Sequence, residues 1–210
     1  MTITYIKCAE QVITVKGGSQ PRRAEEMSAL GIIENGSVLV KNGRIVFVGP
    51  DVKAREYLEH IHEPINIIDA EGKIVTPGLI DPHTHLVFGG SREKELEMRL
   101  NGAKYIDILK AGGGILQTTV STRQATEEEL IKQSTKRLNK FLQYGVTTVE
   151  AKSGYGLNLK DEIKQLKVAK KLNEQHPVDV VSTFMGAHAV PVEYKGNEDA
   201  FVQHVIEEMI

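Results

Sequence analysis

Cysteine is almost absent from this 210-residue sequence, in which Cys8 is the single example. An internal disulfide framework and a zinc site built from cysteine pairs are therefore excluded. Apolar runs of about 18 residues, the length of a membrane-spanning helix, do not occur, and the N-terminus lacks the charged-then-apolar layout of a signal peptide. We therefore expect a cytoplasmic protein in a reducing compartment.

An excess of charge of one sign is also missing. The sequence has 26 Lys and Arg residues against 28 Asp and Glu residues, and its formal net charge is −2. These charges are interleaved, so no strong field exists to gather nucleic acid or an anionic membrane surface. The composition, with 40% hydrophobic and 26% charged residues, is that of a folded globular chain. Binding to nucleic acid or to a membrane surface is therefore not expected.

Several well-known catalytic motifs do not occur. The sequence has neither the His-Glu-x-x-His helix of metalloproteases nor the Gly-x-Ser-x-Gly turn of serine hydrolases. The glycine cluster at 112–114 lacks the Gly-Lys-Ser/Thr ending of a phosphate loop and the spacing of a dinucleotide-binding turn. Nucleotide binding is therefore rejected, and these glycines are more typical of a hinge or of close backbone approach.

Two histidines one residue apart, His83 and His85, follow an apolar run that reads as a strand. Side chains alternate along a strand, so both imidazoles face the same way, and Asp81 is expected on the same face. The Cα atoms of the two histidines would be separated by about two rises of 3.3 Å. A lone histidine is more often an ordinary surface or core residue, but two at strand spacing favour a metal site, since neutral imidazole is the commonest metal ligand. Catalytic zinc usually takes three protein ligands plus water, so a further ligand must come from elsewhere.

The first 75 residues read as β structure. Asn42 and Gly43 stand between two β-rich runs, 37–41 and 44–49, and this pair is the strongest short hairpin signal. Further strands are expected over 9–15 and 65–69, a short helix over 51–60, and a long polar connection over 16–35.

Beyond residue 75 the pattern changes to strands that alternate with helices. Thr126 and Glu129 form a capping-box pair at the start of the clearest helix, which Gly145 is placed to end. Further strands are expected over 146–151 and 178–185, and further helices over 92–110 with a break at 101–102, over 160–175, and from about 198. This alternation predicts a parallel sheet or a (β/α) barrel.

Residues with useful chemistry follow the carboxyl ends of these successive strands. They are His83, His85, Lys152, Tyr155 and His188. Barrel enzymes assemble their sites at this end of the strands, although loops are polar in any case. The convergence favours one shared site.

The run 77–85 resembles the first barrel strand of the amidohydrolase superfamily. Within that superfamily, four separated segments resemble the imidazolonepropionase family in the correct order. They are 85–93, 111–115, 150–157 and 184–191.

The resemblance implies an α/β fold with two parts. Residues 76–210 would form the first three strands of a partial (β/α)8 TIM-type barrel, and residues 1–75 a β-rich segment of a composite β-sandwich domain. A complete barrel has eight strands. We therefore expect the chain to be the N-terminal portion of a longer enzyme, whose other metal ligands and proton-transfer residues lie outside this sequence.

The resemblance also implies an activity: metal-dependent hydrolysis of the ring amide C–N bond of 4-imidazolone-5-propanoate to N-formimidoyl-L-glutamate, in histidine degradation. One zinc or iron ion is the implied cofactor, and a homodimer is the implied state of the full-length protein. His83 and His85 correspond to metal ligands, whereas Arg92, Tyr105, Tyr155 and His188 correspond to substrate-binding residues, His188 also being catalytic. A guanidinium suits the propanoate carboxylate because it offers paired charge-assisted hydrogen bonds.

Alternatives remain at the level of the sequence. The superfamily also contains other cyclic amidases and deaminases of heterocycles. Some members use a carboxylated lysine to bridge two metals, which draws attention to Lys152, although the family match favours one metal. A third interpretation is a non-catalytic half-fold that assembles on a partner.

Overall fold

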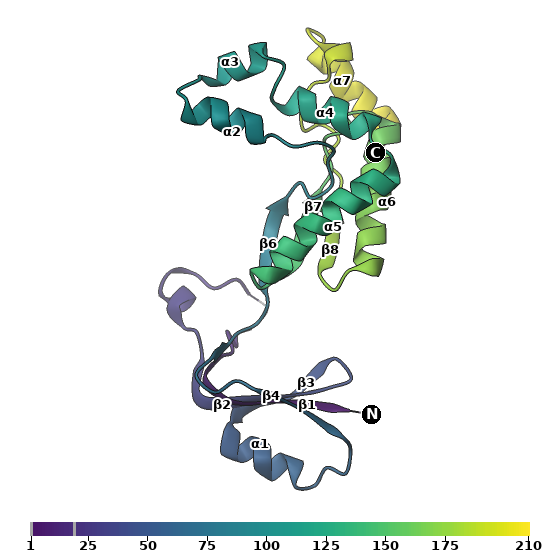
Figure 1. Cartoon of the computed structure of the whole chain (residues 1–210). Coiled ribbons are helices and arrows are strands. Elements are labelled where there is room, and N and C mark those ends of the chain that lie inside the picture. Colours follow the sequence, from purple (N-terminus) through teal and green to yellow (C-terminus); the bar gives the residue numbers. More distant parts are fainter. Residues whose placement is uncertain (1, 19) are drawn as a thin grey trace. The chain divides into compact units, whose positions relative to one another are not determined.

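The computed structural model describes residues 2–18 and 20–210. The chain divides into two compact units, Met1–Pro77 and Gly78–Ile210 (Figure 1). In the described part of the chain, no helix has the length and apolar character needed to cross a membrane.

The N-terminal unit is built on a mixed five-stranded sheet with the order β3-β2-β1-β4, and β5 also pairs with β1. The strands are β1 (Ile3–Ile13), β2 (Ile32–Lys41), β3 (Arg44–Pro50), β4 (Ile65–Asp69) and β5 (Ile74–Val75). Strand β1 runs antiparallel to β2 and parallel to β4 and β5. Helix α1 (Asp51–Leu58) places Ala54 in a core with Ile3, Tyr5 and Leu39.

The predicted hairpin is confirmed at the turn between β2 and β3. Lys41 pairs with Arg44, and both turn residues have positive φ, 52° at Asn42 and 73° at Gly43. Two positive φ angles define the turn whose twist matches that of paired strands, which is why an Asn-Gly pair is favoured there.

The long connection predicted over 16–35 is shorter than expected, because β2 begins at Ile32. The early part of β2 pairs with the end of β1, where the side chain of Gln11 donates to Glu34 at 3.0 Å. This part of the ladder is exposed and carries polar side chains, so the sequence there lacks the alternating apolar pattern by which strands are predicted. A single-turn 3-10 helix, Ala24–Ser28, occupies the remaining connection.

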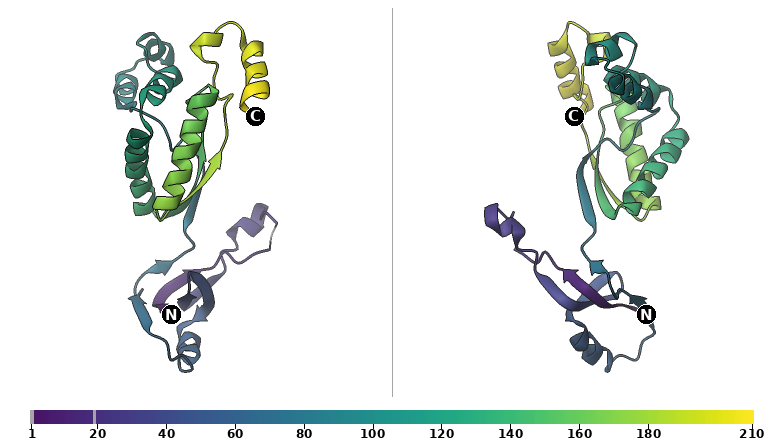
Figure 2. Two further views of the ribbon diagram at one scale, coloured as in Figure 1. Left: turned by 90° about the vertical axis from the view of Figure 1, so that its right-hand side faces the viewer. Right: turned by 60° about the vertical axis from the view of Figure 1, so that its left-hand side comes forward.

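The C-terminal unit contains a three-stranded parallel sheet with the order β6-β7-β8. The strands are β6 (Leu79–Thr84), β7 (Val146–Lys152) and β8 (Asp179–Thr183). Figure 2 shows helices α5 (Glu127–Gln143) and α6 (Leu159–Gln175) on one side of these strands. Their apolar faces form the core of the unit with the sheet, so the predicted alternation and parallel pairing are confirmed.

The remaining helices lie outside this core layer. They are α2 (Glu93–Leu100), α3 (Tyr105–Lys110), α4 (Ile115–Gln124), η2 (Val192–Tyr194), α7 (Glu198–His204) and the π-helical turn η3 (Val205–Met209). The break predicted at 101–102 separates α2 from α3 and is confirmed.

Helix α4 was not predicted from the sequence. Its buried side chains are threonines, namely Thr118, Thr119 and Thr122, rather than an apolar stripe. The Thr119 hydroxyl donates to the Ile115 carbonyl at 3.1 Å, and the Thr122 hydroxyl accepts from the Gly89 N–H at 3.0 Å. A helix that buries hydroxyl groups in this way has no periodic apolar signal to detect.

The capping box at the start of α5 is present. The Thr126 hydroxyl accepts from the Glu129 N–H at 3.1 Å, and the Glu129 carboxylate accepts from the Thr126 N–H at 2.9 Å. Two N–H groups that the helix cannot satisfy internally therefore gain partners.

We predict that Thr126→Ala lowers the free energy of unfolding by about 1 kcal/mol, because the side-chain acceptor is lost. Urea denaturation followed by circular dichroism measures this change. Thr126→Ser keeps the hydroxyl and is expected to stay within about 0.5 kcal/mol of the parent. An equal loss in both variants would show that the threonine methyl group, and not the cap, stabilises the helix.

Candidate functional site

His83 and His85 lie at the carboxyl end of β6, His85 just beyond the last strand residue, Thr84. Thr84 pairs with Ala151, whose side chain is in the core beneath the helices. Because side chains alternate, the two histidines lie on the opposite face of the sheet, which also carries Glu150. Their ring centroids are 6.3 Å apart.

Asp81 was predicted to lie on the same face of the sheet as His83 and His85, and this prediction is wrong. The ladder between β6 and β7 is irregular between Asp81 and Thr84, and Asp81 pairs with Val149, whose side chain is in the helix-side core. The extra residue shifts Asp81 to the face opposite His83. Its carboxylate instead accepts the His83 backbone N–H at 3.2 Å.

Three successive strand-end loops meet in a cluster of rings. The His85 ring centroid is 4.4 Å from that of His188 and 4.9 Å from that of Tyr155. The Tyr155 and His188 centroids are 5.7 Å apart with nearly perpendicular planes. The structure thus brings together residues from the loops that follow β6, β7 and β8.

His85 has the character of a metal-binding imidazole. Burial, together with the charge of neighbouring His188, lowers the pKa of His85 to about 4, so its ring is neutral at pH 7. Its Nδ1 atom is buried, and within the described residues it has no hydrogen-bond partner. Neutral imidazole with an uncommitted nitrogen is the form that binds metal. The described residues contain no group of three His, Cys, Asp or Glu side chains arranged to hold an ion.

Arg92 lies at the start of α2 and is held by Glu95. One Glu95 oxygen accepts from both Nε and Nη2 of Arg92, at 2.9 and 2.6 Å, and the other accepts from the Gly114 N–H at 2.8 Å. The hydrogen bonds and charge of this carboxylate raise the pKa of Arg92. Coulombic interactions with Tyr155 and Tyr105 raise the same pKa further. Arg92 therefore lies within electrostatic reach of both tyrosines, although Tyr105 is 50% exposed at the start of α3.

Lys152 is engaged by a carboxylate on its own strand. Its ammonium lies 2.5 Å from the Glu150 Oε1 atom, which also accepts from the Thr183 hydroxyl at 2.7 Å. The bonds from Lys152 and Thr183 lower the pKa of Glu150.

Arg137 of α5 anchors the loop after His85, and it was not predicted as a functional residue. Its guanidinium donates to the carbonyls of Leu86 at 3.1 Å, Phe88 at 3.0 Å and Gly90 at 3.4 Å. Its central carbon lies 3.5 Å from the Phe88 ring centroid, and burial lowers its pKa to about 10. The available signal was the position of Arg137, three residues after Ser134 and therefore on the same side of the helix. Ser134 is buried, and its hydroxyl donates to the same Leu86 carbonyl at 3.2 Å.

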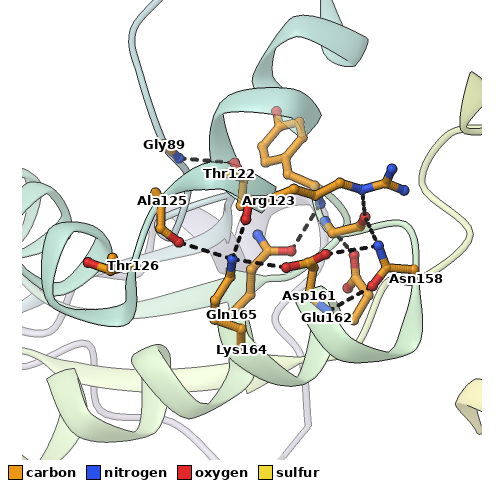
Figure 3. A network of polar contacts seen from close by, with 12 residues as sticks. Gly89, Thr122, Arg123, Ala125, Thr126, Asn158, Asp161, Glu162, Lys164 and Gln165 are labelled. Carbon is orange, nitrogen blue, oxygen red and sulfur yellow. Dashed lines mark hydrogen bonds and ion pairs between the residues drawn. The ribbon is translucent and has the colours of Figure 1, made fainter.

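Helix α6 anchors the neighbouring loop (Figure 3). Asn158 caps the helix by accepting the Asp161 N–H at 2.9 Å, and Lys164 donates to the carbonyls of Arg123 and Ala125 at 2.9 and 3.0 Å. Arg123 in turn donates to the Gly156 carbonyl at 2.7 Å. These contacts tie the end of α4 to the loop that carries Tyr155.

Comparisons with known proteins show which sequences and folds the chain resembles. The sequence profile described as the amidohydrolase family matches residues 66–107. Imidazolonepropionase from Shouchella clausii is 59% identical over 209 residues, which are 99% of this chain and 47% of that relative. The protein of the same name from Brevibacillus brevis is 61% identical over 98% of this chain and 49% of its own length.

The chain is similar to the N-terminal half of imidazolonepropionases. It spans about half the length of the curated relatives it matches. Among solved structures, guanine deaminase from Bradyrhizobium japonicum aligns with a TM-score of 0.58 and 17% identity, over 97% of this chain and 41% of that one. At this identity the likeness concerns the fold alone, which is of the mixed α/β type.

Gly154 lets the loop after β7 approach His188 closely. Its φ is +111°, and a Cβ atom there would lie 2.6 Å from the His188 Cβ and 2.9 Å from the Met185 carbonyl oxygen. Only glycine combines this backbone conformation with this space.

We predict that Gly154→Ala destabilises the protein by about 1–3 kcal/mol more than Gly196→Ala, because overpacking is added to backbone strain. Gly196 is the matched control, since its φ is +80° and nothing lies within 4 Å of its Cβ position. Urea denaturation of both variants measures the difference. Equal losses would show that the contact with His188 is not tight.

Proposed function

We propose that the protein acts in the hydrolysis of the ring amide C–N bond of 4-imidazolone-5-propanoate, which yields N-formimidoyl-L-glutamate in histidine degradation. The observation that carries this proposal is the 59–61% identity to imidazolonepropionases, which extends over at least 98% of the chain. The matched region therefore includes every strand-end loop that contributes to the ring cluster.

We propose further that the three parallel strands are the first three of a (β/α)8 barrel. Residues 76–210 would supply this part, and residues 1–75 a segment of a composite β-sandwich domain. In support, both helices of the core layer, α5 and α6, cover the same face of the sheet, as they do on the outside of a barrel. The face that carries His83 and Glu150 would then point to the barrel interior.

His83 and His85 would hold one zinc or iron ion. The neutral ring of His85 and its buried, unpartnered Nδ1 fit this role. When bound, the ion would supply a Lewis acid and a water molecule of lowered pKa. Other ligands would have to join these two imidazoles, because a catalytic zinc usually has three protein ligands.

The side chains around the cluster suit the substrate. Glu95 holds Arg92 by its Nε and Nη2 edge, which orients the guanidinium to receive the propanoate carboxylate. Burial raises the pKa of Tyr155, so its phenol stays protonated and can donate a hydrogen bond. His188 would donate to the ring carbonyl and stabilise the negative charge that develops there. Tyr105 would complete the substrate site beside Arg92.

The remaining proposals follow from the resemblance and from composition. We propose a homodimer as the assembled state and the cytoplasm as the location, which the single cysteine supports. The proposed partner is a small molecule and not nucleic acid or a membrane.

We predict that His83→Ala and His85→Ala, each made in the complete protein, lose bound metal and slow ring opening at least about 100-fold, because catalytic metal ions contribute several kcal/mol. Elemental analysis gives the metal content, and the loss of imidazolone absorbance gives the rate. His62→Ala is the matched control because His62 is exposed in the N-terminal unit. Retained metal and rate in both site variants would refute the ligand assignment. A panel of other cyclic amides and amino-heterocycles tests the substrate.

We predict that Arg92→Lys raises KM about 10- to 100-fold, because lysine cannot reproduce two charge-assisted hydrogen bonds to one carboxylate. Steady-state kinetics measure the change. Arg99→Lys is the matched control, since Arg99 lies on the same helix and lines the same shallow depression as Arg92. Similar effects of both substitutions would mean that only the general positive charge matters.

A further inference from the structure

Glu162 is a buried acidic residue to which the proposed chemistry assigns no role. Its side chain is 1% exposed in the first turns of α6. Its carboxylate accepts three backbone N–H groups, from Gly154 at 3.0 Å and from Gly156 and Leu157 at 2.8 Å each. In the part of the chain that the structure describes, these N–H groups rather than a cation compensate its charge.

Gln165 lies one turn further along the same face of α6 and is also 1% exposed. Its Oε1 atom accepts the Tyr155 N–H at 3.1 Å, and its Nε2 atom donates to the Val87 carbonyl at 2.6 Å. Gln165 thereby links the Tyr155 loop to the segment two residues after His85. Figure 3 labels both Glu162 and Gln165 on helix α6.

The loop needs this support because its backbone is not in a relaxed conformation. Gly154 has a φ of 111°, and Leu157 has a φ of 53° although it is a buried leucine. A non-glycine residue in the left-handed region persists only where its surroundings fix it. Glu162 binds the N–H group of both residues, and Tyr155 lies between them in the chain.

We propose that Glu162 and Gln165 are positioning residues that hold the Tyr155 side chain against His85 and His188 and thereby set the affinity for the substrate. The proposal rests on the function proposed above. Neither residue contacts the ring cluster through its own side chain in the contacts described, since both act on the loop backbone. Every N–H group from Gly154 to Leu157 is bonded to one of these two side chains.

Glu162→Gln in the complete protein tests this proposal. Glutamine has the same size but only one acceptor oxygen, and its NH2 group would face at least one loop N–H, so a hydrogen bond is lost. We expect amide hydrogen exchange to accelerate at least about tenfold over residues 154–157, and KM to rise about tenfold while kcat changes less than about threefold. A merely structural role would reduce the active fraction, which lowers apparent kcat and leaves KM unchanged.

Glu174→Gln is the matched control, because Glu174 lies on the same helix but is exposed. It should change neither exchange nor KM. If Glu162→Gln does not fold, Gln165→Met provides the second variant, since it keeps the side-chain length and removes both polar contacts. We expect the same pattern of faster loop exchange and raised KM from it.

Unchanged exchange in the loop would overturn the proposal, as would faster exchange with an unchanged KM. The exchange measurement needs no substrate, so its result is separate from the function proposed above. If the parent protein opens no imidazolone ring, that function fails, and 3-fluorotyrosine NMR then decides the positioning role. A Tyr155 resonance that shifts in Glu162→Gln but not in Glu174→Gln would support it, and an unmoved resonance would overturn it.

Discussion

The parallel pairing of β6 with β7 and of β7 with β8 is the constraint on which the candidate site depends. Parallel strands end at the same edge of their sheet, so the loops that follow them are neighbours whatever their separation in sequence. His85, Tyr155 and His188 come from three such loops, yet their rings lie within 5.7 Å of one another by centroid distance. The helices contribute to this arrangement by covering the opposite face, where the apolar core forms.

The loops themselves are held by polar side chains that the helices project toward them. A buried polar group costs free energy unless it is hydrogen-bonded, and a loop backbone brings many such groups. Arg137 supplies donors for the carbonyls after His85, whereas Glu162 supplies acceptors for the N–H groups around Tyr155. Each side chain therefore has the hydrogen-bonding group that its loop requires: Arg137 donates to loop carbonyls, and Glu162 accepts from loop N–H groups.

The sequence predicted the elements whose signals are local. The Asn42–Gly43 turn, the capping box at Thr126 and the alternation of strands with helices each depend on residues close together in the chain. It did not predict α4, because threonine hydroxyls fill that helix's buried face, nor the displaced parity of Asp81, because a strand irregularity leaves no pattern. Glu162 and Gln165 were missed for a related reason: near a helix start they resemble ordinary solvent-facing residues, and only the loop packed over them gives them partners.

The contacts of Glu95 and Thr122 also fasten both ends of one excursion of the chain. Gly89 bonds to Thr122, and Arg92 is joined through Glu95 to Gly114, so the segment from Gly89 to Thr122 leaves the sheet and returns to its own starting point. The two ends of this segment are therefore held next to each other by hydrogen bonds. Changes of length among its outer residues, near α3, can be absorbed there without a change in the distance between the ends. In evolutionary terms, insertions are expected to be tolerated near α3. They are not expected to be tolerated next to the contacts that Thr122 and Glu95 make with Gly89 and Gly114.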